Sequence, residues 1–207
     1  MRFLRRNNSF LIPLIITINV IIFFIWNFSY GEEPLYMLQN FLISWNALAE
    51  GRPWTLITSV FSHNTFWHLF INMYVLMNFG SVLEKIIGSK SFIQFYFTAG
   101  LVSSLAHSIV SAFLIGDPSI PALGASGAIS GLILVFCFLF PREKLYFFGI
   151  VPIPAFWGAL AFIGIDLWGL FAQSQGGGLP IGHGAHLGGA FTGILYYFFF
   201  LRRRIFV

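Results

Sequence analysis

Residues 124–131 read GASGAISG, a run of two serines and three glycines directly before the apolar stretch LILVFCFLF. Glycines four residues apart let two helix backbones approach closely in lipid, so the run suits a packing surface. A serine in such a run more often packs or bonds to backbone than reacts. The run therefore has two interpretations, a packing surface or a serine presented for chemistry, and the rest of the chain decides between them.

The composition indicates an integral membrane protein. Of the 207 residues, 57% are hydrophobic and only 9% are charged, with a mean hydropathy of +0.83. So little polar surface does not cover a soluble globule, and we expect the lipid bilayer as a partner. The net charge of +4 fits basic membrane loops, so we expect no nucleic-acid partner. Cys137 is the only cysteine, which excludes an intramolecular disulfide, and no metal or cofactor is expected.

Six apolar stretches have about the length that crosses a bilayer core of roughly 30 Å. They cover residues 10–28, 66–83, 91–115, 126–140, 155–172 and 185–201, with prolines and glycines in the gaps. The sequence predicts an all-α membrane protein, a six-transmembrane-helix bundle with a long first external loop. We expect residues 1–207 to form a single transmembrane domain.

The basic residues predict the orientation, since Lys and Arg collect on the cytoplasmic side. If both termini are cytoplasmic, Arg52 is the only one of the eleven Lys and Arg residues that falls outside. The other ten fall inside: Arg2, Arg5, Arg6, Lys85, Lys90, Arg142, Lys144, Arg202, Arg203 and Arg204.

These charges also measure depth, because an α-helix rises about 1.5 Å per residue. Ser126 lies sixteen positions before Arg142 and His186 sixteen before Arg202, which puts both roughly 24 Å above the cytoplasmic face. Two residues of the second span reach a similar level: His68 is seventeen positions before Lys85, and Asn72 is thirteen before it. Polar groups from three helices therefore meet at one depth.

Glycine spacing predicts that two of these helices also pack together. Gly127 and Gly131 follow Ser126, and Gly189 and Gly193 follow His186, each pair four residues apart. Mutual packing of these faces would bring Ser126 within reach of His186.

The evidence for a functional role is weaker at four further polar residues. We expect His107 to be structural, without a polar companion at its level, and His63 and His183 to lie near the outer surface. Asp166 in the fifth span has two open interpretations, a hydrogen bond in helix packing or a functional role. We take no carboxylate to lie at the depth of His186.

A serine beside a histidine is typical of nucleophilic catalysis, in which the imidazole takes the hydroxyl proton and later returns it to the leaving group. Without a carboxylate, the pair is a dyad. Ser126 begins a helix, where free backbone N–H groups favour developing negative charge. His68 and Asn72, four apart on one helix face, add side-chain donors.

At these residues the chain resembles the rhomboid family of intramembrane serine proteases, of the compact six-helix type usual in bacteria. The resemblance spans nearly the whole chain and rests on three motifs in order: HLFIN at 68–72, GASG at 124–127 and AHLGG at 185–189. It implies Ser126 as nucleophile, His186 as base, and an oxyanion or substrate site formed by His68, Asn72, Gly124 and the Ser126 amide.

The resemblance also implies hydrolysis of peptide bonds near the outer end of single-span transmembrane substrates. It suggests a multi-pass protein of a bacterial inner membrane. The segment PWTLITSVFSH at 53–63 is similar to the family's first loop, but Thr55 stands where arginine is usual, and Arg52 is a possible substitute.

Two further features bear on the site. Some rhomboids carry a tyrosine, stacked on the catalytic histidine, at the position of Ser130, so another group must hold the His186 ring. The loop QSQGGGLPIGHG at 173–184 suits either a mobile cap over the site or an ordinary flexible connection.

Two other function classes compete with a protease. One is a channel-like protein whose histidine and asparagine groups line a polar cavity. The other is a catalytically dead relative that only binds transmembrane helices. Intact Ser126 and His186 argue against the second, and the lack of repeats argues against a transporter.

Overall fold

The computed structural model describes residues 10–28, 33–147 and 150–202. Five helical segments in these residues are long and apolar enough to cross a membrane. They are α1 (Leu11–Phe28), α5 with η2 and α6 (Phe66–Ile87), α7 with η3 (Ser89–Ile115), α9 (Ala155–Ser174), and α10 with η4 (His183–Leu201). The sixth, α8 (Ser126–Leu139), has only 14 residues. The prediction of an all-α membrane bundle is confirmed, and α8 ends one residue before the predicted boundary of its span.

Three of these segments change from α-helical to π-helical geometry along their length. The second passes from α5 (Phe66–Val75) through η2 (Leu76–Gly80) to α6 (Ser81–Ile87). The third passes from α7 (Ser89–Ile109) to η3 (Val110–Ile115), and the last from α10 (His183–Tyr196) to η4 (Tyr197–Leu201). Each change leaves the apolar segment continuous, so it remains one span.

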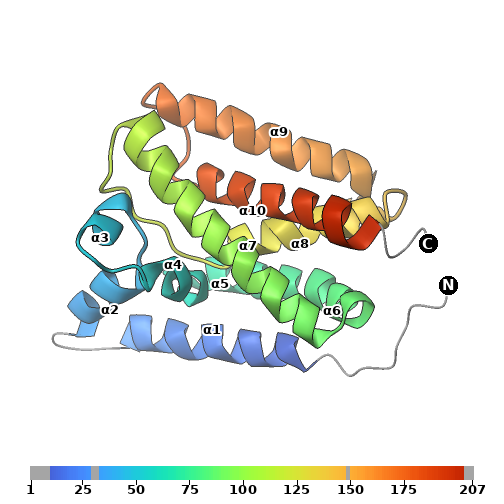
Figure 1. Cartoon of the computed structure of the whole chain (residues 1–207), viewed down its shortest axis with the longest axis horizontal. Coiled ribbons are helices and arrows are strands. Elements are labelled where there is room, and N and C mark those ends of the chain that lie inside the picture. Colours follow the sequence, from blue (N-terminus) through green and yellow to red (C-terminus); the bar gives the residue numbers. More distant parts are fainter. Residues whose placement is uncertain (1–9, 29–32, 148–149, 203–207) are drawn as a thin grey trace.

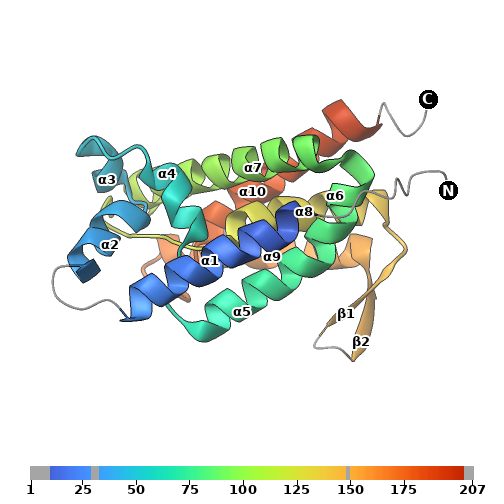
Figure 2. The same ribbon diagram turned by 90° about the horizontal axis from the view of Figure 1, so that it is seen from below.

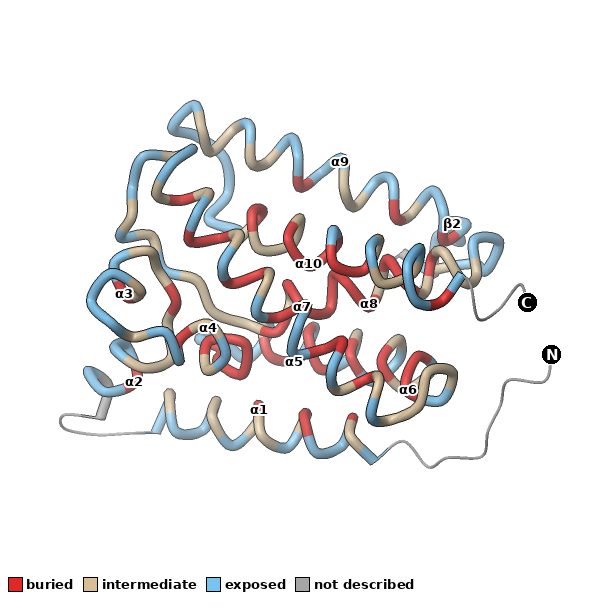
Figure 3. The backbone as a smooth tube through the Cα atoms, in the orientation of Figure 1, coloured by how far each residue is buried: buried red, intermediate tan, exposed pale blue. Residues whose placement is uncertain are grey.

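The helices lie side by side, with α7, α8 and α10 between α1 and α9 (Figure 1). Burial follows this order, because buried residues gather on the inner helices while α1 and α9 are largely exposed (Figure 3). Only 17% of the most apolar window is buried in each of the two outer helices. Exposed apolar faces of this kind fit contact with lipid rather than water.

Short elements cap the two ends of the bundle. The first loop folds into α2 (Glu33–Phe41), α3 (Trp45–Ala49), α4 (Thr55–Thr58) and η1 (Ser59–Phe61) at one end. At the other end, β1 (Lys144–Phe147) and β2 (Val151–Pro154) form an antiparallel hairpin that extends from the bundle (Figure 2). The sequence analysis did not predict this hairpin.

The first loop is held by side chains around Thr55, which stands where the similar first loop of rhomboids usually has arginine. Thr55 is fully buried, and its hydroxyl donates to the Arg52 carbonyl at 2.6 Å. The Arg52 guanidinium donates to the Gln39 carbonyl at 2.6 Å and pairs with Glu50. Trp54 Nε1 donates to the Asn40 side chain at 2.9 Å. Arg52, three positions before Thr55, therefore ties α2 to the segment before α4.

Charge is distributed unevenly between the two ends. Among the described residues, five of the six Lys and Arg lie in elements at the end that carries the start of α1 and the end of η4 (Figure 1). They are Lys85, Lys90, Arg142, Lys144 and Arg202. Arg52 lies at the other end. The remaining basic residues, Arg2, Arg5, Arg6, Arg203 and Arg204, fall outside the described residues.

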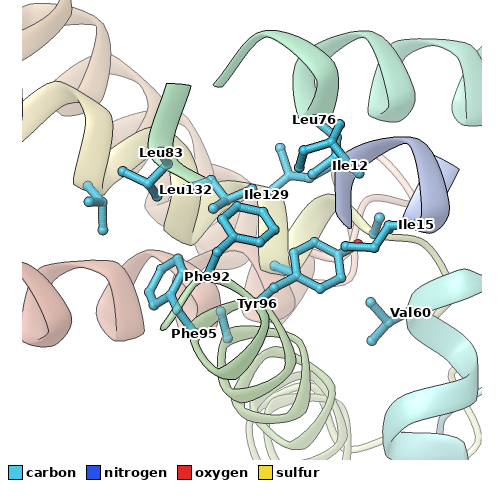
Figure 4. Packing of buried hydrophobic residues seen from close by; sticks show 14 of the residues in the cluster. Ile12, Ile15, Val60, Leu76, Leu83, Phe92, Phe95, Tyr96, Ile129 and Leu132 are labelled. Carbon is cyan, nitrogen blue, oxygen red and sulfur yellow. The ribbon is translucent and has the colours of Figure 1, made fainter. Parts of the chain in front are cut away.

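The core forms where α1, η2, α7 and α8 meet. Ile12 and Ile15 of α1 face Phe92 and Tyr96 of α7, with Leu132 of α8 beside them (Figure 4). All five side chains are at most 2% exposed. A packed apolar core around α8 fixes the start of that helix, where Ser126 lies.

Candidate active site

The structure brings Ser126 and His186 together. Ser126 is the first residue of α8, and His186 lies in the first turn of α10. The His186 Nε2 atom lies 3.0 Å from the Ser126 hydroxyl oxygen, within hydrogen-bond distance. A histidine at this distance can take the hydroxyl proton directly.

Glycines make this approach possible. A Cβ atom at position 189 would lie 1.7 Å from the Gly127 carbonyl oxygen, and one at position 193 would lie 2.5 Å from that of Gly131. A Cβ at Gly131 would in turn meet the Gly189 carbonyl oxygen at 2.8 Å. The backbones of α8 and α10 are therefore in contact along the two glycine pairs, which sets the separation of Ser126 from His186.

A carboxylate lies at the site, contrary to the sequence-based expectation. Asp166 of α9 is 3% exposed, and its Oδ1 atom lies 3.0 Å from His186 Nδ1. The same oxygen lies 2.7 Å from His183 Nδ1. The expectation that no carboxylate lies at the depth of His186 is wrong, because α9 packs Asp166 against the first turn of α10.

His63 and His183 are also more enclosed than expected. Both are buried, His183 against Asp166 and His63 in the segment between η1 and α5. The rings of His63 and His68 meet edge to face at 4.8 Å between centroids. Burial, together with the neighbouring His68, lowers the pKa of His63 from 6.5 to about 3. His63 is therefore neutral at physiological pH, because its charged form has lost its hydration.

His107 has a polar partner that the sequence did not reveal. Its Nε2 atom lies 3.1 Å from the carbonyl oxygen of Ile120, in the loop that leads to α8. That loop is also paired with the first loop, because Ile43 and Ala122 exchange backbone hydrogen bonds of 2.8 and 3.0 Å. These contacts fix the approach of the chain to Ser126.

The ring of His186 is held by an aromatic residue from another helix. Phe162 of α9 stacks on it, with centroids 5.9 Å apart and planes inclined by 27°. The Ser130 hydroxyl instead donates to the Ser126 backbone carbonyl at 2.7 Å. Phe162 therefore stacks on His186, in place of the tyrosine that some rhomboids carry at the position of Ser130.

Of the described residues predicted to form the oxyanion site, His68 and Gly124 lie at the turn before Ser126, whereas Asn72 does not line the cavity. Gly124 has a φ of +115°, which favours glycine, and a Cβ there would lie 2.7 Å from the His68 ring. His68 therefore lies directly against the turn before Ser126. The Asn72 side chain is buried and donates to the His68 carbonyl at 2.8 Å. It is not among the described residues that line the cavity, so its role as a donor stays a prediction.

A cavity of about 970 Å³ opens beside Ser126, and both His68 and His186 line it. The loop after α9 forms part of its wall, including Gly178, Leu179 and Pro180. Gln173 holds this loop, since its side-chain nitrogen donates to the carbonyls of Leu179 and Ile181 at 2.8 Å each. The loop thus forms part of the wall of the site, and its role as a mobile cap stays a prediction.

Comparison with known proteins identifies the family. A model of the rhomboid domain matches residues 50–203, which include Ser126, His186 and all three motifs. The chain belongs to the rhomboid family. This rhomboid chain has curated relatives in plants, fungi and animals.

Three relatives show the extent of the similarity. RHOMBOID-like protein 12, mitochondrial, of Arabidopsis thaliana is 35% identical over 75% of this chain and 48% of its own length. Rhomboid protein 1, mitochondrial, of Saccharomyces cerevisiae is 31% identical over 90% of this chain and 52% of its own. The human presenilin-associated rhomboid-like protein, mitochondrial, is 33% identical over 88% and 46%. This rhomboid chain thus spans about half the length of the curated relatives it matches.

Proposed function

We propose that this rhomboid chain is an intramembrane serine endopeptidase that cuts single-span transmembrane proteins near the outer end of their helices. The observation that carries the proposal is the 3.0 Å contact between His186 Nε2 and the Ser126 hydroxyl at the wall of a cavity. Membership of the rhomboid family, which includes serine proteases, supports the same function.

The geometry supports acyl transfer in two steps. His186 takes the Ser126 proton as the serine oxygen bonds to the substrate carbonyl carbon, and it then gives that proton to the leaving amine. A water molecule hydrolyses the resulting ester, again with His186 as base, and restores the serine.

Negative charge develops on the carbonyl oxygen in both steps. The N–H groups in the first turn of α8 have no intrahelical acceptor, and the positive end of the helix dipole lies there. They are the main donors of the proposed oxyanion site, with His68 beside Gly124 as a side-chain donor. Asn72 would join them after releasing the His68 carbonyl.

A transmembrane substrate helix must unwind before it can react. In lipid its carbonyls are hydrogen-bonded within the helix, so a carbonyl reaches the oxyanion donors only where the helix opens. Glycine and proline weaken a helix by about 1 and 3 kcal/mol relative to alanine. We therefore propose that small or helix-weakening residues near the outer end mark the cleaved bond.

The distribution of charge supports one orientation of the chain in its membrane but does not identify the membrane. The charge asymmetry of the described residues supports the start of α1 and the end of η4 on the cytoplasmic or equivalent side, with the cavity facing the other. The relatives bear mitochondrial and chloroplastic names, which do not favour the expected bacterial inner membrane.

The test is cleavage of a single-span substrate by the full chain in lipid vesicles, together with labelling by a fluorophosphonate. We expect Ser126→Ala to abolish both and His186→Ala to reduce both by several orders of magnitude. Ser130→Ala is the matched control, because that hydroxyl lies one helical turn away and donates to a backbone carbonyl. Cleavage that survives Ser126→Ala would refute the proposal.

A further inference from the structure

One face of α9 holds both histidines that begin α10. Phe162, Asp166 and Gly169 are spaced by four and three residues, so they lie along one side of the helix. Phe162 stacks on His186, and Asp166 contacts His183 and His186. A Cβ at Gly169 would lie 2.2 Å from His183 Nε2, so the absence of a side chain there makes room for the His183 ring.

The two contacts of Asp166 fix the tautomer of His186. An ionised carboxylate only accepts hydrogen bonds, so Nδ1 of each histidine donates to Asp166 Oδ1. A neutral His186 with its proton on Nδ1 has its lone pair on Nε2, and Nε2 faces the Ser126 hydroxyl at 3.0 Å. This is the form that can act as a base toward serine.

The second donor fixes the carboxylate itself. Oδ1 has two lone pairs, and the bonds of 2.7 and 3.0 Å from His183 and His186 use both. Asp166 is 3% exposed, so water does not compete freely for this oxygen. Two hydrogen bonds to one oxygen fix the position of that oxygen, and they constrain the His186 ring in the same way.

We infer that Asp166 is a positioning residue that acts through His186. The His183 ring, in the space that Gly169 leaves open, holds Asp166 in place. The inference rests on the proposed function, and it changes the expected dyad into a chain from His183 through Asp166 and His186 to Ser126. The step moves one proton, from the Ser126 hydroxyl to His186 Nε2, while Asp166 keeps its charge and stabilises the imidazolium.

The same three side chains are of the types that hold zinc, so the distances matter. Their ligand atoms lie within 4.8 Å of one another, but both nitrogens are within 3.0 Å of one oxygen. Ligands at about 2.0–2.1 Å from a tetrahedral zinc ion lie roughly 3.3 Å apart. The observed separations fit N–H···O hydrogen bonds better.

The decisive experiment compares Asp166→Asn with Asp117→Asn in the full chain. Asp117 is the only other aspartate and is exposed in the loop before α8. We expect Asp166→Asn to lower kcat for a single-span substrate by about 10² to 10⁴-fold with KM little changed, as for the aspartate of Ser-His-Asp enzymes. Asp117→Asn should leave both unchanged, and so should a chelator added to the wild type.

Nitrogen-15 spectra of the histidine rings supply a measurement that needs no activity. In the wild type, the neutral form of His186 should carry its proton on Nδ1, assigned by comparison with His186→Gln. Asp166→Asn should convert this to a mixture of tautomers. Asp166→Glu should restore part of the Nδ1 form and part of kcat.

The outcomes separate the two proposals. An unchanged His186 tautomer in Asp166→Asn, or a kcat within threefold of wild type, would overturn the positioning role even if stability falls. Loss of activity on chelation would overturn it in favour of a metal site. Absence of any Ser126-dependent cleavage would overturn the proposed function alone, because the spectra still report the bond between Asp166 and His186.

Discussion

Gly189→Ala tests whether backbone contact between α8 and α10 sets the reacting distance. The added Cβ would lie 1.7 Å from the Gly127 carbonyl oxygen, whereas real Cβ atoms essentially never come closer than 3.0 Å. The obstacle is backbone, so no side chain can turn aside. The two helices must separate locally by about 1.3 Å to relieve the contact.

This shift falls three residues from His186. Added to the present 3.0 Å between His186 Nε2 and the Ser126 oxygen, it breaks the hydrogen bond. Misplacing reacting groups by about 1 Å costs about 10²-fold in rate. We therefore expect Gly189→Ala to lower the rate of fluorophosphonate labelling at Ser126 by about 10²-fold or more.

Two further alanine variants grade the effect. At Gly193 the Cβ would lie 2.5 Å from the Gly131 carbonyl oxygen, so a smaller shift one turn further from His186 should slow labelling less. Gly164 has no neighbour within 4 Å of its Cβ position, and Gly164→Ala should label like the wild type. Labelling of Gly189→Ala at the wild-type rate, or faster than Gly193→Ala, would refute the packing argument.

Three other predictions follow from single contacts. Gly124→Ala should lose most cleavage activity, because it forces φ near +115° on alanine and drives a Cβ into the His68 ring, while Gly51→Ala, with φ +78° and open space, should remain active. Phe162→Leu should lower kcat by about two- to tenfold by removing the ring stacked on His186, and an unchanged kcat would contradict this. His63 has a folded pKa of about 3 against 6.5 unfolded, so the unfolded chain binds protons first and stability falls as pH drops below 6.5. Acidification from pH 7 to 5 should destabilise the wild type by about 2 kcal/mol more than His63→Gln, measured by thermal unfolding in detergent, and equal losses would count against a neutral His63.

The spans and the meeting of Ser126 with His186 could be predicted because each depends on one-dimensional signals. Apolar length gave the spans, and distance from the basic residues gave the depth. Glycine spacing indicated which two helices touch. Backbone contact at Gly127 and Gly189 is the direct result of that pattern.

The partners of His186 depend on how α9 is rotated, which its sequence does not determine. The helix is apolar around its circumference, so no polar stripe distinguishes the face with Phe162 and Asp166 from the face toward lipid. Depth alone could have suggested Asp166. It lies eleven residues beyond Ala155, or roughly 17 Å along α9. Ser126 lies thirteen residues before Leu139, or roughly 20 Å along α8, so the two levels differ by less than one helical turn.

The hydrogen bond of His107 and the β1–β2 hairpin could not be predicted from the sequence either. His107 bonds a backbone carbonyl thirteen residues later, and every residue type carries such a carbonyl. The β1 and β2 strands have four residues each and contain two prolines, a composition that argues against strands by propensity. Pairing with each other and attachment to α9 override it.

The short length of α8 is compatible with the proposed hydrolytic site at this depth. Fourteen residues span about 21 Å, less than a hydrocarbon core of roughly 30 Å. If α8 ends at the cytoplasmic boundary, Ser126 and the irregular loop before it lie below the outer boundary. Non-helical backbone is tolerated at that depth only where protein or a water-filled cavity surrounds it. The cavity of about 970 Å³ beside Ser126 meets this condition, and it has room for the water that the proposed reaction consumes. The short helix therefore meets two needs of the proposed reaction, an open helix terminus to stabilise the oxyanion and a cavity next to it with room for water.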